Sequence, residues 1–202
     1  MSKDTSKYLL LAAAMFAFGG YMLLRREDSG IPTLLGEKIY YPELDMLNNS
    51  KLPRGYRNNN PLNIDYYNAY GQRANDWKGQ IGVEPEGRFS QFRDLVYGYR
   101  AALVLLRGKG YINGGNDTIR KMISKFAPNN ENYTDGYIAN VSRMTGINPD
   151  EQISRNDRDK LTRIVYAMSI IENGTKDKDG NDIQSTYGLP NMDVINEAWE
   201  II

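Results

Sequence analysis

Residues 54–64 read RGYRNNNPLNI, and four of the six residues from Asn58 to Asn63 are asparagine. The short asparagine amide competes for backbone hydrogen bonds, so this residue is unfavourable inside helices and strands and favoured in turns. The sequence therefore predicts a turn around Pro61, immediately before an apolar and aromatic segment.

The chain that follows this turn changes its pattern at Arg93. Glycines punctuate the segments NIDYYNAYG (63–71) and GQIGVEPEGRFSQF (79–92), which predicts short strands and turns. From Arg93 onward, apolar residues recur at spacings near three and four, which predicts helices. Helices are expected over 93–106, 116–128, 134–146, 154–174 and 191–202. The expected fold class is α+β and mainly helical, with a small β-hairpin region.

Capping residues suggest where these helices begin and end. The expected first residues or caps are Asn116 or Asp117, Thr134, and Ser154 or Asn156, and the expected ends include Gly146 and Gly174. The segment KDKDGNDI (176–183) superficially resembles a calcium loop. Its acidic residues lack the required spacing, so a turn is expected there.

An uncharged segment precedes these elements. Residues 8–24 read YLLLAAAMFAFGGYMLL, and about 17 residues is near the lower limit for a helix that spans a bilayer. No small-residue cleavage site follows before Arg25, so a retained transmembrane helix is favoured over a cleaved signal peptide or a buried core helix. The expected organisation is a polar tail over 1–7, the transmembrane helix over 8–24, a linker over 25–42 and one folded domain over 43–202, with a recognisable core at 53–150 and a helical C-terminal part at 151–202.

Composition excludes several kinds of chemistry. The chain has no cysteine and no histidine, which excludes disulfides, thiol catalysis, Ser-His-Asp catalysis and almost every zinc site. The formal net charge is zero, so no basic excess argues for a nucleic-acid partner. No cofactor or metal ion is expected, and any catalysis depends on carboxylates, hydroxyls, amides, lysine or arginine.

Four sequence blocks together resemble a family of short bacteriophage proteins. The blocks are RGYRNNNPLNI, WKGQ, GRFSQFRDLVYGYRAALVLL and FAPNNENYTDGYIANVSRMTGINP, and they span about Pro53 to Pro149. Proteins of that family are described as virion or structural proteins, and sometimes as peptidoglycan hydrolases. The resemblance covers neither the apolar N-terminal segment nor the last fifty or so residues.

The same region resembles, more distantly, lysozyme-like glucosaminidases and lytic transglycosylases. Those enzymes have a glutamate that ends a helix, an asparagine-rich turn into a hairpin, Trp-Lys-Gly, an acidic hairpin tip and then aromatic residues before a helix. This chain offers Glu43, the turn at 58–64, WKG at 77–79 and the tip VEPEGRF at 83–89. It departs from the pattern at Glu43, which follows a proline and is followed by leucine where the family usually has a Glu-Ser pair within a long helix.

The resemblance implies a particular set of catalytic residues. Cleavage of a β-1,4 glycosidic bond requires a protonated carboxyl that donates to the leaving oxygen, and a second group that stabilises the charged centre or activates water. Glu43, with apolar neighbours in sequence that would raise its pKa, is the expected general acid. Glu84 or Glu86 is the expected second carboxylate, although turn glutamates are commonly solvated. A lytic transglycosylase needs only the acid, because a hydroxyl of the sugar itself attacks.

Substrate-binding residues are implied by the same resemblance. Asn60 and Asn63 could hydrogen-bond N-acetyl groups, and Tyr66 and Trp77 could stack on sugar rings. The alternative is that the asparagines hold the turn and the aromatic residues pack in the core.

Two hypotheses from different classes follow. The first is a membrane-anchored, virion-associated enzyme that cleaves peptidoglycan while the genome passes into the cell. The second is a non-catalytic structural protein of a membrane-containing bacteriophage, and a weaker third is a bacterial envelope protein of prophage origin. The expected partners are peptidoglycan, a lipid membrane and other virion proteins, without nucleic acid. The expected location is the internal virion membrane or the host envelope, with a single-pass N-terminal anchor.

Overall fold

The computed structural model describes residues 24–26, 32–34, 46–47, 49–68, 70–72, 74–128 and 133–202. The chain divides into two units, residues 1–45 and 46–202. In the first unit the strands β1 (Leu24–Arg26) and β2 (Pro32–Leu34) pair antiparallel. They lie in the segment expected to be a linker, except that β1 begins at Leu24, the last residue of the expected transmembrane helix. The expected transmembrane segment lies, up to residue 23, outside the described residues. Among the described residues, no helix is both long and apolar enough to cross a bilayer.

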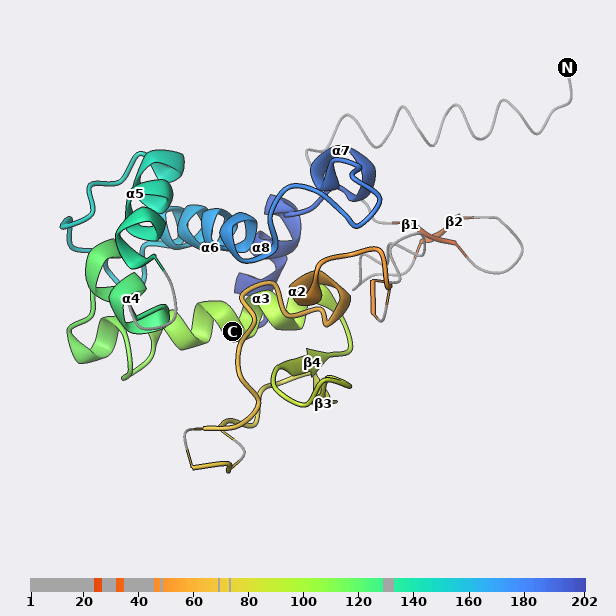
Figure 1. The fold of residues 1–202 in the computed structure, drawn as a ribbon, viewed down its shortest axis with the longest axis horizontal. Helices are drawn as coiled ribbons and strands as arrows, with labels where there is room; N and C mark the ends of the chain where they lie inside the picture. Colours follow the sequence, from red (N-terminus) through yellow and green to blue (C-terminus); the bar gives the residue numbers. More distant parts are fainter. Residues whose placement is uncertain are drawn as a thin grey trace, which may run out of the picture. The chain divides into compact units, whose positions relative to one another are not determined.

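The second unit is α+β and rich in helix, as the sequence predicts (Figure 1). Helices α4 (Ile119–Phe126) and α5 (Thr134–Thr145) lie at one end, the hairpin of β3 (Gln80–Val83) and β4 (Ser90–Phe92) lies at the other, and α3 (Leu95–Arg107) runs between them. The elements are α2 (Arg54–Arg57), β3 (Gln80–Val83), β4 (Ser90–Phe92), α3 (Leu95–Arg107), the 3-10 turn η1 (Ile112–Gly114), α4 (Ile119–Phe126), α5 (Thr134–Thr145), α6 (Arg158–Asn173), α7 (Ile183–Tyr187) and α8 (Met192–Glu200).

The asparagine run forms the expected turn. Asn59 and Asn63 adopt left-handed backbone conformations, with φ of 50° and 49°, which asparagine tolerates better than most residues. The fully buried Asn60 side chain donates to the carbonyls of Ile64 and Ser90 and accepts from the Ile64 N–H. These bonds satisfy backbone groups that would otherwise be buried without partners. The turn is therefore held by its own side chains.

The hairpin β3–β4 docks against this turn. The Ser90 N–H donates to the Ile64 carbonyl, and the Phe92 N–H donates to the Asn58 carbonyl. The Asn59 side chain donates to the Phe92 carbonyl. The turn and the hairpin consequently form one hydrogen-bonded layer.

Five helices differ from the sequence expectation, either in their existence or in the residue that caps them. The single-turn helix α2 and the short α7 were not predicted, because neither is long enough to show a helical period. Helix α4 is capped by the side chain of Thr118, and α6 by that of Asp157, so the caps expected one to three residues earlier were wrong. The Thr134 hydroxyl donates to the Ala127 carbonyl, 2.5 Å away, and does not cap α5. The expected ends at Gly146 and Gly174 are confirmed.

Helix α3 lies directly against the asparagine turn. Its residue Gly98 has no room for a side chain, because a methyl group there would overlap the carbonyl oxygen of Asn59 and approach Pro61 Cδ to 2.9 Å. We expect Gly98→Ala to destabilise the fold by about 1–3 kcal/mol, since overpacking forces backbone to move. Urea unfolding of the two chains measures the loss. Gly110→Ala, whose new methyl group would meet only Lys125 Cε at 3.9 Å, is the control and should change stability far less.

Candidate functional site

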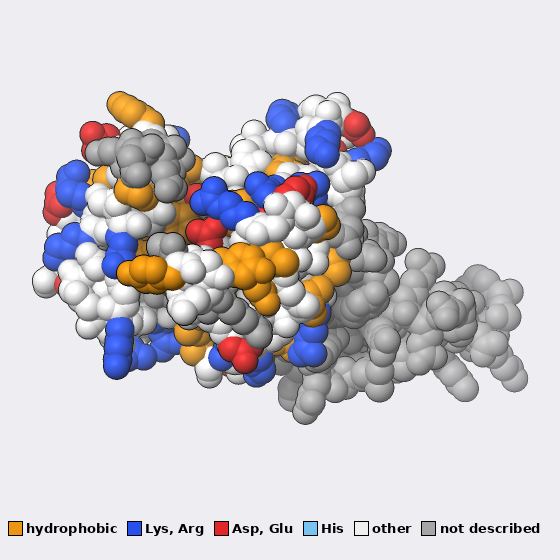
Figure 2. Space-filling model, turned by 60° about the horizontal axis from the view of Figure 1, so that its bottom comes forward, with side chains coloured by type: hydrophobic (Ala, Val, Ile, Leu, Met, Phe, Trp, Pro, Cys, Tyr) orange, Lys and Arg blue, Asp and Glu red, His pale blue; other side chains and the backbone are white. Residues whose placement is uncertain are grey.

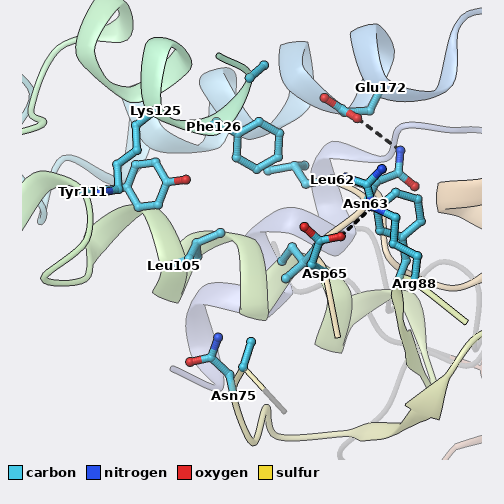
Figure 3. Close-up of a pocket in the computed structure, with 14 residues that line it drawn as sticks. Leu62, Asn63, Asp65, Asn75, Arg88, Leu105, Tyr111, Lys125, Phe126 and Glu172 are labelled. Carbon is cyan, nitrogen blue, oxygen red and sulfur yellow. Dashed lines mark hydrogen bonds and ion pairs between the residues drawn. The ribbon is translucent and has the colours of Figure 1, made fainter. Parts of the chain in front are cut away.

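A pocket of about 680 Å³ lies where the turn, the hairpin tip and the helices α3, α4 and α6 meet (Figure 3). On the face of the molecule shown in Figure 2, acidic, basic and hydrophobic side chains gather around a hollow near the centre. The pocket of Figure 3 is also lined by acidic, basic and hydrophobic side chains. Its lining residues are Leu62, Asn63, Ile64, Asp65, Ala74, Asn75, Arg88, Phe89, Leu105, Tyr111, Lys125, Phe126, Ala127 and Glu172.

Glu172 is the carboxylate at one end of this pocket. It lies at the last turn of α6, where the neighbouring Asn173 donates to the Pro61 carbonyl and so ties the helix end to the asparagine turn. The Glu172 carboxylate accepts a hydrogen bond from Asn63 Nδ2 at 3.1 Å and another from the Tyr137 hydroxyl at 2.9 Å. Both bonds join residues that are far apart in the sequence.

The pKa of Glu172 is raised above the ordinary value for glutamate. Burial is the main cause, because a charged carboxylate loses its water shell there. The hydrogen bonds from Asn63 and Tyr137, and the charge of Arg88, oppose this effect only in part. A carboxyl with these properties can hold a proton closer to neutral pH than an exposed glutamate can.

A second carboxylate lies across the pocket. Asp65 pairs with Arg88, with 2.8 Å between Asp65 Oδ1 and Arg88 Nε. Asp65 is also bridged to Phe89 through backbone pairing, and the Arg88 guanidinium lies 4.7 Å from the centre of the Phe89 ring. The charges of Asp65 and Arg88, which line the same pocket as Glu172, therefore compensate each other.

The three glutamates expected from the sequence lie in different places. Glu43 lies outside the described residues. The Glu84 side chain is fully buried and accepts from Arg54 Nε and Nη2, from Asn58 Nδ2 and from the Phe89 N–H. Burial alone would raise its pKa, but these hydrogen bonds outweigh burial and lower it. Glu86 lies at the exposed tip of the hairpin and pairs with Arg57.

The four expected substrate-binding residues also lie in different places. Asn63 lines the pocket, whereas Asn60 is fully buried in the turn and bonds the backbone. Tyr66 is half-buried and lies edge-to-face with Tyr67, with ring centres 4.8 Å apart. Trp77 is half-buried with its indole N–H enclosed. Neither aromatic residue is among those that line this pocket.

Sequence reasoning did not select Glu172, although one signal pointed to it. The residue interrupts an apolar stretch of α6, IVYAMSIIEN, at a position where a helix normally continues its buried face. A carboxylate in such surroundings is unusual unless it has partners. Those partners come from the turn and from α5, so only the folded chain shows them.

The segment 176–183 is a turn held by Asp177. One oxygen of this buried carboxylate accepts from the N–H groups of Asp179 and Asn181, and the other accepts from the Asn181 side chain and the Tyr187 hydroxyl. In the part of the chain that the structure describes, no group of three or more acidic side chains is arranged to hold a metal ion.

Comparison with known proteins identifies a relative. No protein-family model matches the chain. The chain is 32% identical over 134 residues to Protein P5 of Pseudoalteromonas phage PM2, a match that covers 66% of this chain and 79% of that protein. The resemblance to bacteriophage proteins is thereby confirmed. The chain belongs to the family of Protein P5 of Pseudoalteromonas phage PM2.

Proposed function

We propose that this protein is a virion-associated peptidoglycan-cleaving enzyme, a lytic transglycosylase or glucosaminidase-like glycosidase, in which Glu172 is the general acid. The single observation that carries the proposal is the Glu172 carboxyl, which lines a pocket of about 680 Å³ and is held there by Asn63 and Tyr137. Pockets that combine an apolar wall with a few convergent polar groups are the usual sites of small-molecule chemistry.

Cleavage of the glycosidic bond requires a carboxyl that is protonated before the reaction. Glu172 would donate its proton to the glycosidic oxygen as the bond to the leaving sugar breaks. After the transfer, the carboxylate is negative, and the amide of Asn63 and the hydroxyl of Tyr137 are already placed to donate to it. The two donors thus stabilise the charged form of the acid when it has lost its proton.

The same arrangement supports a lysozyme-like site. The lysozyme-like pattern calls for a glutamate at the end of a helix beside an asparagine-rich turn, and Glu172 at the end of α6 fits that description beside Asn63. In this chain the helix follows the turn in sequence, whereas Glu43 would precede it. Asp65, fixed by Arg88, is the carboxylate available for the stabilising role.

The proposal places the enzyme at a membrane of the virion or of the host envelope. The uncharged segment 8–24 would anchor it, and the folded part would reach the wall while the genome enters. Other virion proteins would be its neighbours. Membership in a bacteriophage family supports the virion assignment.

The test is cleavage of isolated cell walls by the full-length chain in mild detergent. Clearing of the suspension is expected, together with soluble glycan fragments identified by mass spectrometry. Attack by a hydroxyl of the sugar leaves an internal anhydro ring, whereas attack by water leaves a reducing end, so the fragments distinguish the two reactions. A folded chain that clears no wall and releases no fragments would instead support a structural role in the virion.

The pH dependence of this activity should report on Asn63. A general acid works while it is protonated, so the activity falls as the pH rises through its pKa. Asn63 donates to the carboxylate and lowers the pKa of Glu172, so Asn63→Gly should move the alkaline limb of the profile to higher pH. Glycine also accepts the left-handed backbone at this position.

Asn75→Gly is the matched control, because Asn75 lines the same pocket but makes no hydrogen bond to Glu172. The alkaline limb of the pH–activity profile of Asn75→Gly should coincide with that of the unaltered chain. An alkaline limb that stays in place, or moves to lower pH, in Asn63→Gly would exclude the proposed role of this amide.

A further inference from the structure

The end of the pocket away from Glu172 is formed by Tyr111 and Lys125 (Figure 3). Tyr111 follows α3, and its side chain is enclosed, with only 7% of the residue exposed. Its hydroxyl nevertheless points toward the interior of the pocket. Within the described ranges, no residue forms a hydrogen bond with this hydroxyl. The hydroxyl is not among the buried polar atoms of the described residues that lack a partner, so it is open to the pocket and available to donate to a ligand there.

Lys125 adds an uncompensated positive charge to this end. Its amine lies 5.8 Å from the centre of the Tyr111 ring, and among the described residues it makes no ion pair. The other cation of the pocket, Arg88, is paired with Asp65. When Glu172 holds its proton, the pocket therefore carries one net positive charge, at the end formed by Lys125.

We infer that Tyr111 and Lys125 form a subsite for a carboxylate of the substrate, so that the pocket selects glycan strands that retain their acidic peptide stems over neutral glycans. This inference rests on the proposed function and names the substrate class of the same pocket. The apolar side chains of Leu105 and Phe126 line the pocket beside the subsite and offer surface to the uncharged part of the ligand.

The two residues supply different parts of carboxylate recognition. The Tyr111 hydroxyl donates a hydrogen bond, and because burial raises the pKa of this tyrosine to about 12, it keeps its proton throughout the physiological range. The Lys125 amine is exposed on a flexible four-carbon stem and supplies the charge. Hydrogen bonds to a charged acceptor are stronger than those between neutral groups.

The test measures binding to the full-length Glu172→Gln chain in mild detergent, so that the ligand is not consumed. The probes are soluble wall glycans with intact peptide stems, and β-1,4-linked N-acetylglucosamine oligomers of the same length, which carry no carboxylate. We expect about tenfold tighter binding of the stem-bearing glycan at low salt. That preference should weaken as ionic strength rises, because salt screens an exposed charge.

Substitutions at Tyr111 and Lys125 test whether these two residues cause the preference for the stem-bearing glycan. Lys125→Met and Tyr111→Phe, each in the Glu172→Gln background, should lose most of the preference, and Lys125→Arg should retain it. Lys121→Met is the matched control, because Lys121 lies one turn away on α4, pairs with Asp117 and does not line the pocket. Circular dichroism shows that each variant is folded.

Equal binding of the two glycans, no binding of either, or equal losses in Lys125→Met and Lys121→Met would overturn the subsite. None of these results decides whether the unaltered chain cleaves walls, which the clearing assay measures separately. Conversely, a stem preference that depends on Lys125 together with absent cleavage would support the subsite and refute the enzyme.

Discussion

Replacement of Glu172 by glutamine is expected to slow cleavage of cell-wall glycan by about 10²–10⁴-fold, because the general acid is lost. Glutamine keeps the size of the side chain. Its one amide oxygen can still accept from Asn63, and its NH2 group can donate to the Tyr137 hydroxyl, so both residues that bond the carboxylate in the unaltered chain keep a partner. It cannot donate a proton to the leaving oxygen. Clearing of wall suspensions by the two full-length chains, at equal concentration and over a range of pH, measures the loss.

Two other glutamates provide controls for this experiment. Glu200→Gln alters an exposed residue that pairs with Arg158, and Glu86→Gln alters the exposed hairpin tip. Normal clearing is expected from the first variant. If Glu86→Gln strongly slowed clearing and Glu172→Gln cleared walls normally, the catalytic carboxylate would be Glu86, at the hairpin tip, as the sequence suggested. The loss of activity can be attributed to the missing general acid only if Glu172→Gln and the unaltered chain unfold at the same temperature.

Glu84→Ala is expected to destabilise the folded unit by about 2–4 kcal/mol, because buried donors lose their acceptor. The loss is smaller than for a fully buried ion pair, since the Arg54 side chain that remains is 36% exposed. The Glu84 side chain is fully buried, and its loss would leave Arg54, Asn58 and the Phe89 N–H without their acceptor. The contact between the turn and the hairpin would be weakened, and the remaining hydrogen bonds from Asn59, Ser90 and Phe92 would have to hold it. Urea unfolding of the full-length chains in mild detergent measures the difference in free energy.

Glu86→Ala, two residues away, is the matched control. Its side chain is 44% exposed in the pair with Arg57, and exposed ion pairs contribute about 1 kcal/mol or less. Equal destabilisation by the two substitutions would show that Glu84 does not hold the turn to the hairpin.

The contribution of Glu84 also depends on pH, with a definite sign. Its pKa is lower in the folded chain than its ordinary value of 4.5, so folding favours the charged form. The stabilisation is complete above the pKa of the unfolded chain and is lost as the pH falls through the lowered value. Unfolding free energies measured from neutral pH into this acidic range should fall more steeply for the unaltered chain than for Glu84→Ala.

Local signals in the sequence determined much of this architecture. The asparagine run predicted the turn because each amide can bond backbone a few residues away, as Asn60 does with Ile64. Apolar spacing predicted the long helices, because a helix of several turns repeats its buried face. One turn of helix shows no such period, and for that reason α2 was missed.

The candidate site depended on contacts that no local pattern contains. Asn63 and Glu172 are separated by 109 positions, and their hydrogen bond exists because Asn173 fixes the end of α6 to the Pro61 carbonyl. Likewise the sequence placed Glu84 on a glycine-flanked tip, where a solvated charge is usual, but docking of the hairpin on the turn buries it against Arg54. The sequence by itself determined which segments turn and which are helical, since those preferences act between near neighbours. Only the tertiary structure decided that the half-buried Glu172 has a raised pKa and the fully buried Glu84 a lowered one, since both depend on what packs around the carboxylate.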